Sequence, residues 1–78
     1  MKTYTRKQVT EMEQNREDLI FDVTYVRNNI TYTRSFYKLE KAIEYIKTTK
    51  GVTFKNSIVY ILQEVNNGND TEIIGVVK

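Results

Sequence analysis

The sequence predicts one α+β domain, a two-layer sandwich in which a helix covers a four-stranded, largely antiparallel sheet. Three features of the 78 residues support this fold class. Two strand-like segments flank an Asn-Asn turn within residues 19–36, one amphipathic segment follows, and two apolar strands come last. We therefore expect a single small domain over residues 1–78, with an N-terminal helical arm over residues 1–17 and a ββαββ core over residues 18–78.

A capping signature predicts the first helix, from Arg6 to Arg16. Thr5 and Gln8 stand in the N-cap and N3 relation of a capping box. The apolar stripe of this segment contains only Val9 and Met12. Since most helix stability comes from tertiary burial, we expect this helix to be frayed or to order only against a partner.

The first strand pair is a hairpin that turns at Asn28-Asn29. Asn tolerates the positive φ that a two-residue hairpin turn requires. One face of this hairpin is apolar and the other is mainly Thr, Ser and Asp. The turn predicts the pairs Phe21 with Phe36, Val23 with Arg34, Thr24 with Thr33 and Tyr25 with Tyr32.

The amphipathic segment from Lys38 to Lys50 predicts the main helix, with Gly51 as its C′ residue. Helical spacing places Lys38, Lys41 and Tyr45 on one flank. This basic and aromatic flank could grip an acidic protein surface or phosphate, or it could be an ordinary solvated flank. We take Arg34, Lys38, Lys41 and Tyr45 as the candidate partner-binding residues.

The last hairpin, from Ser57 to Val77, is apolar on both faces, whereas a half-solvated strand alternates apolar with polar residues. Gly75 within it suggests a bulge or the close approach of another backbone. The main helix can cover one sheet face only, and the order of the strands stays open. The side chains expected to face away from that helix are Ile20, Val26, Val59, Ile61, Ile74 and Val76.

This surplus apolar face predicts a homodimer formed through the open face or edge of the sheet. Its cover could be a dimer mate, a target protein or the N-terminal helix. At about 1.5 to 3 kcal/mol for each buried aliphatic side chain, such a cover would add several kcal/mol to a small domain. The expected dimer-interface residues are Val59, Ile61, Ile74 and Val76.

The composition argues against catalysis, since the chain contains no Cys and no His. These absences remove the usual zinc and haem ligands, the Ser/His and Cys/His nucleophile pairs and the commonest general base. We expect no enzyme, no cofactor and no metal. No apolar run approaches the roughly 18 residues of a membrane span, and the N-terminus lacks a signal-peptide apolar region. We therefore expect a cytoplasmic protein without a membrane partner.

The net charge of +2 conceals a separation of charge along the sequence. Residues 27–55 carry seven basic and two acidic side chains, whereas the segments on either side are weakly acidic. These features predict a small homodimeric protein that binds and inhibits another protein. Its size and its richness in Asn, Lys, Ile, Tyr and Thr are typical of products of phages or mobile elements of low-GC bacteria. The alternative is a nucleic-acid-binding protein that uses the basic segment 27–55.

Overall fold

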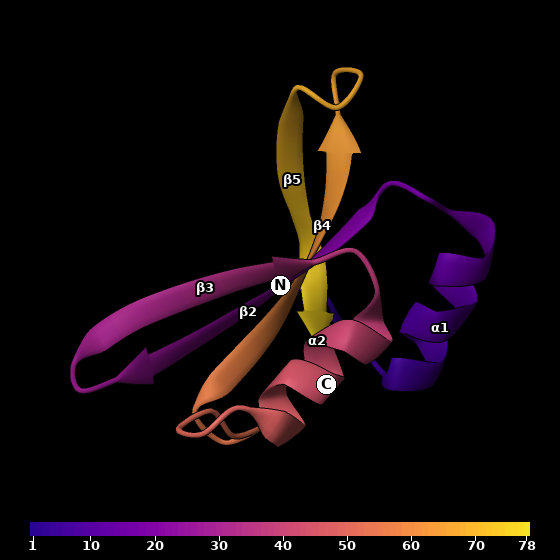
Figure 1. Ribbon diagram of the computed structural model, residues 1–78. Helices are drawn as coiled ribbons and strands as arrows, with labels where there is room; N and C mark the ends of the chain where they lie inside the picture. The colour runs from indigo at the N-terminus through magenta and orange to yellow at the C-terminus, as the bar shows by residue number, and fades with distance from the viewer.

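The computed structural model describes residues 1–78 and shows two helices and five strands (Figure 1). The α+β class expected from the sequence is confirmed. In chain order the elements are β1 (Thr3–Tyr4), α1 (Arg6–Asn15), β2 (Leu19–Arg27), β3 (Ile30–Phe36), α2 (Leu39–Thr48), β4 (Ser57–Val65) and β5 (Asp70–Val77).

The sheet is five-stranded and mixed, with the strand order β1-β5-β4-β2-β3. The expectation of a four-stranded antiparallel sheet is therefore wrong. β1 adds to the edge of β5 in parallel, while the other neighbours are antiparallel. The addition is held by Val76 N–H, which donates to the Lys2 carbonyl at 2.9 Å, and by Lys78 N–H, which donates to the Tyr4 carbonyl at 2.7 Å.

Gly75 explains why β1 can approach so closely. A Cβ atom at Gly75 would lie 2.8 Å from the Lys2 carbonyl oxygen and 2.6 Å from the Tyr4 ring. The strand pairing also shifts register opposite this residue, between Ile61 and Leu62. The sequence predicted either a bulge or the close approach of another backbone at Gly75, and the structure shows both.

The first hairpin forms in the expected register. Asn28 and Asn29 adopt φ values of 53° and 64°, which is the left-handed conformation that a two-residue turn requires. The observed pairs include Phe21 with Phe36, Val23 with Arg34, Thr24 with Thr33 and Tyr25 with Tyr32.

The helices begin close to where the sequence places them. The capping box at the start of α1 is present, since Thr5 N–H donates to Gln8 Oε1 at 2.8 Å and Gln8 N–H donates to Thr5 Oγ1 at 3.2 Å. α2 is shorter than expected, because Thr49 is its C-cap residue. A turn follows that carries the buried Val52 into the core, and Gly51 takes its positive φ of 87° in this turn and not at C′.

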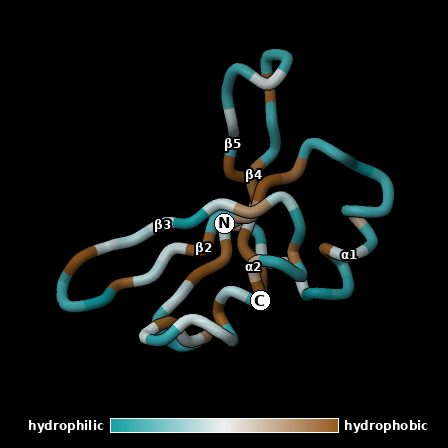
Figure 2. The backbone as a smooth tube through the Cα atoms, viewed as in Figure 1, coloured by the Kyte–Doolittle hydropathy of each residue, from teal (hydrophilic) through white to brown (hydrophobic).

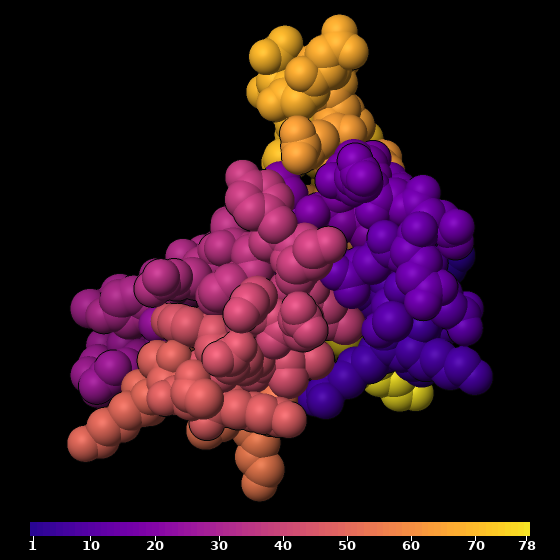
Figure 3. Space-filling view, turned by 45° about the vertical axis from the view of Figure 1, so that its right-hand side comes forward, coloured from indigo at the N-terminus to yellow at the C-terminus, as the bar shows by residue number.

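Both helices lie on the same side of the sheet (Figure 1), and Figure 3 shows the side chains of α1 (indigo to purple) beside those of α2 (pink) on one face of the molecule. α1 contributes Val9, which is fully buried, to the core that α2 and the sheet form. The N-terminal helix therefore does not cover the second sheet face. Figure 2 shows apolar chain along much of β2 and mostly hydrophilic chain along α1. The core residues are Val9, Leu19, Phe21, Val23, Tyr25, Leu39, Ala42, Ile46, Val52, Val59 and Ile61.

The register between β2 and β4 decides which face of the last hairpin is buried. Phe21 pairs with Ile61, and Val23 pairs with Val59. Directly paired residues share a face of the sheet, and Phe21 and Val23 are both fully buried. Val59 and Ile61 therefore point into the core, where they are 8% and 0% exposed. The expectation that they face away from the helix is wrong.

The bulge separates the other two residues of the expected dimer interface. Ile73 pairs with Leu62 and Gly75 pairs with Ile61, which leaves Ile74 as the extra residue of β5. Ile74 is half-buried against the core, whereas Val76 pairs with Tyr60 on the opposite face. Of the four expected interface residues, Val76 alone lies on the outer face of the sheet.

Candidate protein-interaction surfaces

The outer face of the sheet, opposite the two helices, carries a cluster of apolar side chains. These residues lie on the outer face of β2, β4 and β5, and none belongs to the core. Leu62 pairs with both Ile20 and Ile73, Tyr60 pairs with Val76, and Ile58 pairs with Thr24 of β2. Ile58 and Ile73 are 49% and 51% exposed, and the other members are half-buried. We name this cluster the outer apolar patch; its members are Ile20, Ile58, Tyr60, Leu62, Ile73 and Val76.

The other half of the outer face, over β2 and β3, is mainly polar, with the exposed Val26 as its one apolar side chain. Ser35 Oγ donates to Asp22 Oδ1 at 2.5 Å, and the hydroxyls of Thr24 and Thr33 lie 3.0 Å apart. None of the paired positions on this face of β2 to β5 is Lys or Arg. The paired positions of the outer face therefore offer apolar, hydroxyl and carboxylate contacts and no basic group.

Three of the four candidate partner-binding residues lie together on the helix side, where α2 meets β3. The guanidinium carbon of Arg34 lies 5.4 Å from the centre of the Tyr45 ring. Lys41 and Tyr45 line one shallow hollow of about 280 Å³. Lys41 also pairs with Glu44 at 3.7 Å, but both side chains are more than half exposed, so this ion pair adds little stability.

Tyr45 is held in place by its aromatic neighbours. Its hydroxyl lies 2.9 Å from the hydroxyl of Tyr25, and its ring centre lies 5.3 Å from that of Phe36. The hydrogen bond with Tyr45, together with burial, raises the pKa of Tyr25 above its usual value. Tyr45 therefore has a packing role within the molecule in addition to its contact with Arg34.

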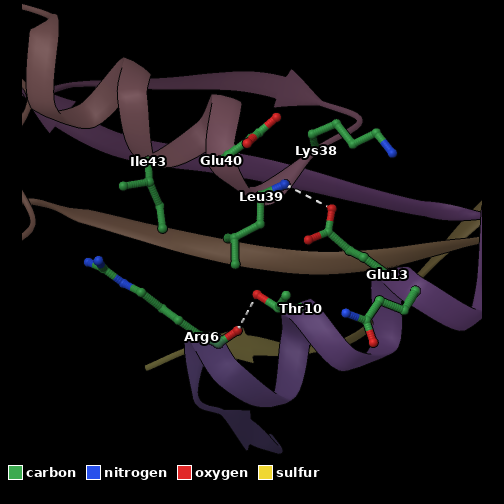
Figure 4. A pocket seen from close by; sticks show the side chains of 8 residues that line it. Arg6, Thr10, Glu13, Lys38, Leu39, Glu40 and Ile43 are labelled. Atoms are coloured by element: carbon green, nitrogen blue, oxygen red, sulfur yellow. Dashed lines mark hydrogen bonds between the residues drawn. The ribbon is translucent and has the colours of Figure 1, made fainter.

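Lys38 lies apart from this group, at the cleft between α1 and α2 (Figure 4). The cleft measures about 440 Å³, and only Leu39 and Ile43 among its lining residues are apolar. Glu13 reaches across the cleft, and its Oε2 accepts a hydrogen bond from Leu39 N–H at 3.2 Å. Because the Lys38 side chain makes no cap bond of its own, Glu13 caps α2 from the neighbouring helix.

A further polar contact, which the sequence pattern did not reveal, fixes the connection between α1 and β2. The Arg16 guanidinium donates two hydrogen bonds to the Asp18 carboxylate, both at 3.0 Å, and a third to Gln63 Oε1 at 2.5 Å. The hydrogen bond from Arg16 lowers the pKa of Asp18. No buried side-chain nitrogen or oxygen atom in the molecule lacks a hydrogen-bond partner.

The other feature that sequence reasoning missed is the position of β3 at the edge of the sheet. Its residues are exposed along almost the whole strand, from Ile30 to Ser35. The register of β2 with β3 was predictable from the turn that joins them. The strand that pairs with the other edge of β2, which is β4, was not. Only the observed strand order shows that β3 has a free edge.

Comparison with protein-family models, with curated proteins and with solved structures gives no significant match. Each of the two helices has 10 residues, about half the length that a membrane-spanning helix needs. No group of three or more acidic side chains is placed to hold a metal ion. The surfaces themselves are therefore the basis on which function is inferred.

Proposed function

We propose that this chain is a small non-enzymatic protein that binds and modulates another protein through its outer apolar patch. The observation that carries the proposal is that both helices pack on one face of the sheet and leave the patch on the other. Modulation by inhibition, and an origin in a phage or mobile element, belong to the same proposal and are supported by size and composition alone.

The energetic argument rests on the exposed aliphatic side chains. Ile58 and Ile73 are each about half exposed, and complete burial of an Ile side chain contributes about 1.5 to 3 kcal/mol. Their half-buried neighbours Tyr60 and Leu62 extend the same surface across two strands. Covering the exposed halves of Ile58 and Ile73 therefore contributes about 1.5 to 3 kcal/mol for the two together. Covering the remaining exposed area of Tyr60 and Leu62 adds to this, before the cost of association.

The charge distribution favours a protein partner for this face. A surface that binds nucleic acid neutralises phosphates with Lys and Arg, and the outer face has neither at its paired positions. Protein interfaces, in contrast, have apolar centres that are depleted of charge.

A nucleic-acid partner remains a second candidate for the helix side, where Arg34 and Lys41 flank Tyr45. Glu44 forms an ion pair with Lys41 in the same place, which reduces the local positive charge. Binding of nucleic acid there should weaken steeply as salt rises. A gel shift at two salt concentrations with the double variant Arg34→Glu/Lys41→Glu tests this candidate.

The test of the main proposal compares three immobilised proteins in capture from a lysate of the source cell. The unmodified chain and the control Phe54→Lys should retain the same protein, and Ile58→Lys/Ile73→Lys should lose it. Phe54 is a matched control because it is 48% exposed and lies away from the patch. The retained protein is then purified and its affinity for each variant is measured. Equal binding to all three would refute a role of the patch.

A further inference from the structure

β3 is an unprotected edge strand. It lies at the end of the sheet order, it contains no Pro, and Arg34 is its one charged residue. Natural proteins usually shield such edges with charges, bulges or short strands, because the free backbone groups pair readily with another strand. The opposite edge shows these protections: β5 has a bulge and carries Asp70 and Glu72, and β1 covers its end.

The turn at Asn28-Asn29 determines which backbone groups of β3 are free. In a two-residue hairpin the residues that flank the turn, here Arg27 and Ile30, form a hydrogen-bonded pair. Hydrogen-bonded and non-hydrogen-bonded pairs alternate along the ladder. The N–H and C=O groups that point away from β2, toward the free edge, are therefore those of Thr31, Thr33 and Ser35.

We propose that a second copy of this chain occupies this edge, with the two β3 strands antiparallel and Thr33 on the two-fold axis. Thr31 then faces Ser35 of the second copy, Tyr32 faces Arg34, and Ile30 faces Phe36. The outward groups of Thr31, Thr33 and Ser35 all find partners in this register. Arg34 meets an aromatic ring, and the two apolar ends of the strand meet each other.

The neighbouring registers are worse. Hydrogen bonds between the two β3 strands can form only through Thr31, Thr33 and Ser35, whose backbone groups point outward. In any alternative register of the dimer these three residues must therefore still lie opposite one another. One such register places Arg34 opposite Arg34 of the second copy, where like charges repel. The register shifted in the other direction places Arg34 opposite Ile30. Each shift also leaves strand ends unpaired, so the register centred on Thr33 is favoured by both charge and hydrogen bonding.

The helix side is also complementary to itself. α2 lies over β2 and β3, so joining the two β3 edges brings the two α2 helices side by side, about 10 Å apart. The hollow beside β3, lined by Lys41, Glu44, Tyr45 and Thr48, then faces its own copy. Since Lys41 and Glu44 carry opposite charges, the two flanks can pair without net repulsion.

This dimer does not depend on the proposed target. The two-fold axis keeps both outer faces on the same side of a continuous sheet, so the outer apolar patches stay accessible. The dimer therefore uses a surface different from the interface expected from the sequence, of which Val59 and Ile61 are buried in the core.

Cysteine cross-linking tests the register, because the natural chain contains no Cys. In Thr33→Cys the two Cα atoms lie about 5.5 Å apart, which suits a disulfide. We expect mild oxidation to convert most of this variant to a covalent dimer. The control Thr24→Cys lies on the same face one strand inward, about 14 Å from its copy, and should stay uncoupled. A mixture of Thr31→Cys and Ser35→Cys should give the heterodimer and little of either homodimer.

Light scattering of the unmodified protein should give twice the 9.2 kDa of the chain at high micromolar concentration. The variant Ile58→Lys/Ile73→Lys should keep this dimer, which separates the inference from the proposed target binding. A monomer at this concentration, a dimer lost in Ile58→Lys/Ile73→Lys, or equal cross-linking of Thr33→Cys and Thr24→Cys would each overturn it. Loss of the dimer in Ile58→Lys/Ile73→Lys would indicate pairing through the outer face. Equal cross-linking of Thr33→Cys and Thr24→Cys would indicate that the two chains have no defined register.

Discussion

The carboxylate of Glu13 in α1 accepts a hydrogen bond at 3.2 Å from the backbone N–H of Leu39, the first residue of α2. The first N–H groups of a helix lack partners within the helix, and a negative charge there also interacts favourably with the helix dipole. α2 thus takes its cap from a residue 26 positions earlier in the chain. This contact joins the two helices that cover the core.

Replacing Glu13 by Ala should lower the free energy of unfolding by about 1 kcal/mol, the usual cost of a lost cap. Glu13→Gln should lose less, because an amide oxygen can still accept the bond. Urea denaturation measures both. Glu11→Ala is the matched control, since the Glu11 side chain is exposed and makes no hydrogen bond in α1; an equal loss there would contradict a specific cap.

Removing one methylene from each of two isoleucines on opposite faces of β4 tests which face of this strand belongs to the core. Ile61→Val should cost about 0.5 to 1.5 kcal/mol of unfolding free energy, because Ile61 is fully buried. Ile58→Val should cost much less, because Ile58 is 49% exposed. Urea denaturation of the two variants gives the comparison, and the reverse order would place the other face of β4 in the core.

Gly75→Ala should loosen the contact between β1 and β5. The added Cβ would lie 2.8 Å from the Lys2 carbonyl oxygen, which is backbone and cannot move without shifting β1. Overpacking of this kind typically costs about 1 to 3 kcal/mol. Hydrogen exchange should show faster exchange at the Val76 and Lys78 amides, which bond to β1. Amides between β2 and β4 should keep their protection relative to each other; uniform loss would indicate global destabilisation instead.

The hydrogen bond between Tyr25 and Tyr45 makes stability sensitive to alkaline pH. The pKa of Tyr25 is raised in the folded protein, so folding favours the neutral phenol. The stabilisation is therefore complete below the unfolded pKa of about 10 and is lost as the pH rises through the higher folded pKa. Absorbance titration of tyrosinate should show one tyrosine that ionises late, and Tyr45→Phe should lower its pKa. No change in this titration would refute the coupling.

At acidic pH the group to follow is Asp18. Its pKa is lowered by the hydrogen bond from Arg16, so its contribution is present above the unfolded pKa of about 3.9 and is lost as the pH falls through the lower folded pKa. NMR titration of the carboxyl groups should show Asp18 titrating below an ordinary Asp. Arg16→Gln should return the pKa of Asp18 toward its normal value, whereas Lys7→Gln, an exposed change elsewhere in α1, should leave it unaffected.

Local sequence determined the features that depend on residues close together in the chain. Thr5 and Gln8 specify the start of α1, because each satisfies a backbone group within one turn. Asn28 and Asn29 specify the first turn and therefore the register of β2 with β3. The grouping of Lys41 with Tyr45 follows from helical spacing, and Arg34 joins them because the hairpin returns it toward the helix.

Tertiary structure decided the features that depend on contacts between distant segments. Ile58 and Ile61 are equally apolar, so periodicity could not tell which belongs to the core; the pairing of Ile61 with Phe21 decided it. β1 is too short to be recognised as a strand and exists because β5, more than 60 residues later, offers an edge at Gly75. In the same way β3 became the free edge only when β2 paired with β4. Long-range pairing free energies depend on which surfaces meet, and a single strand does not contain that information.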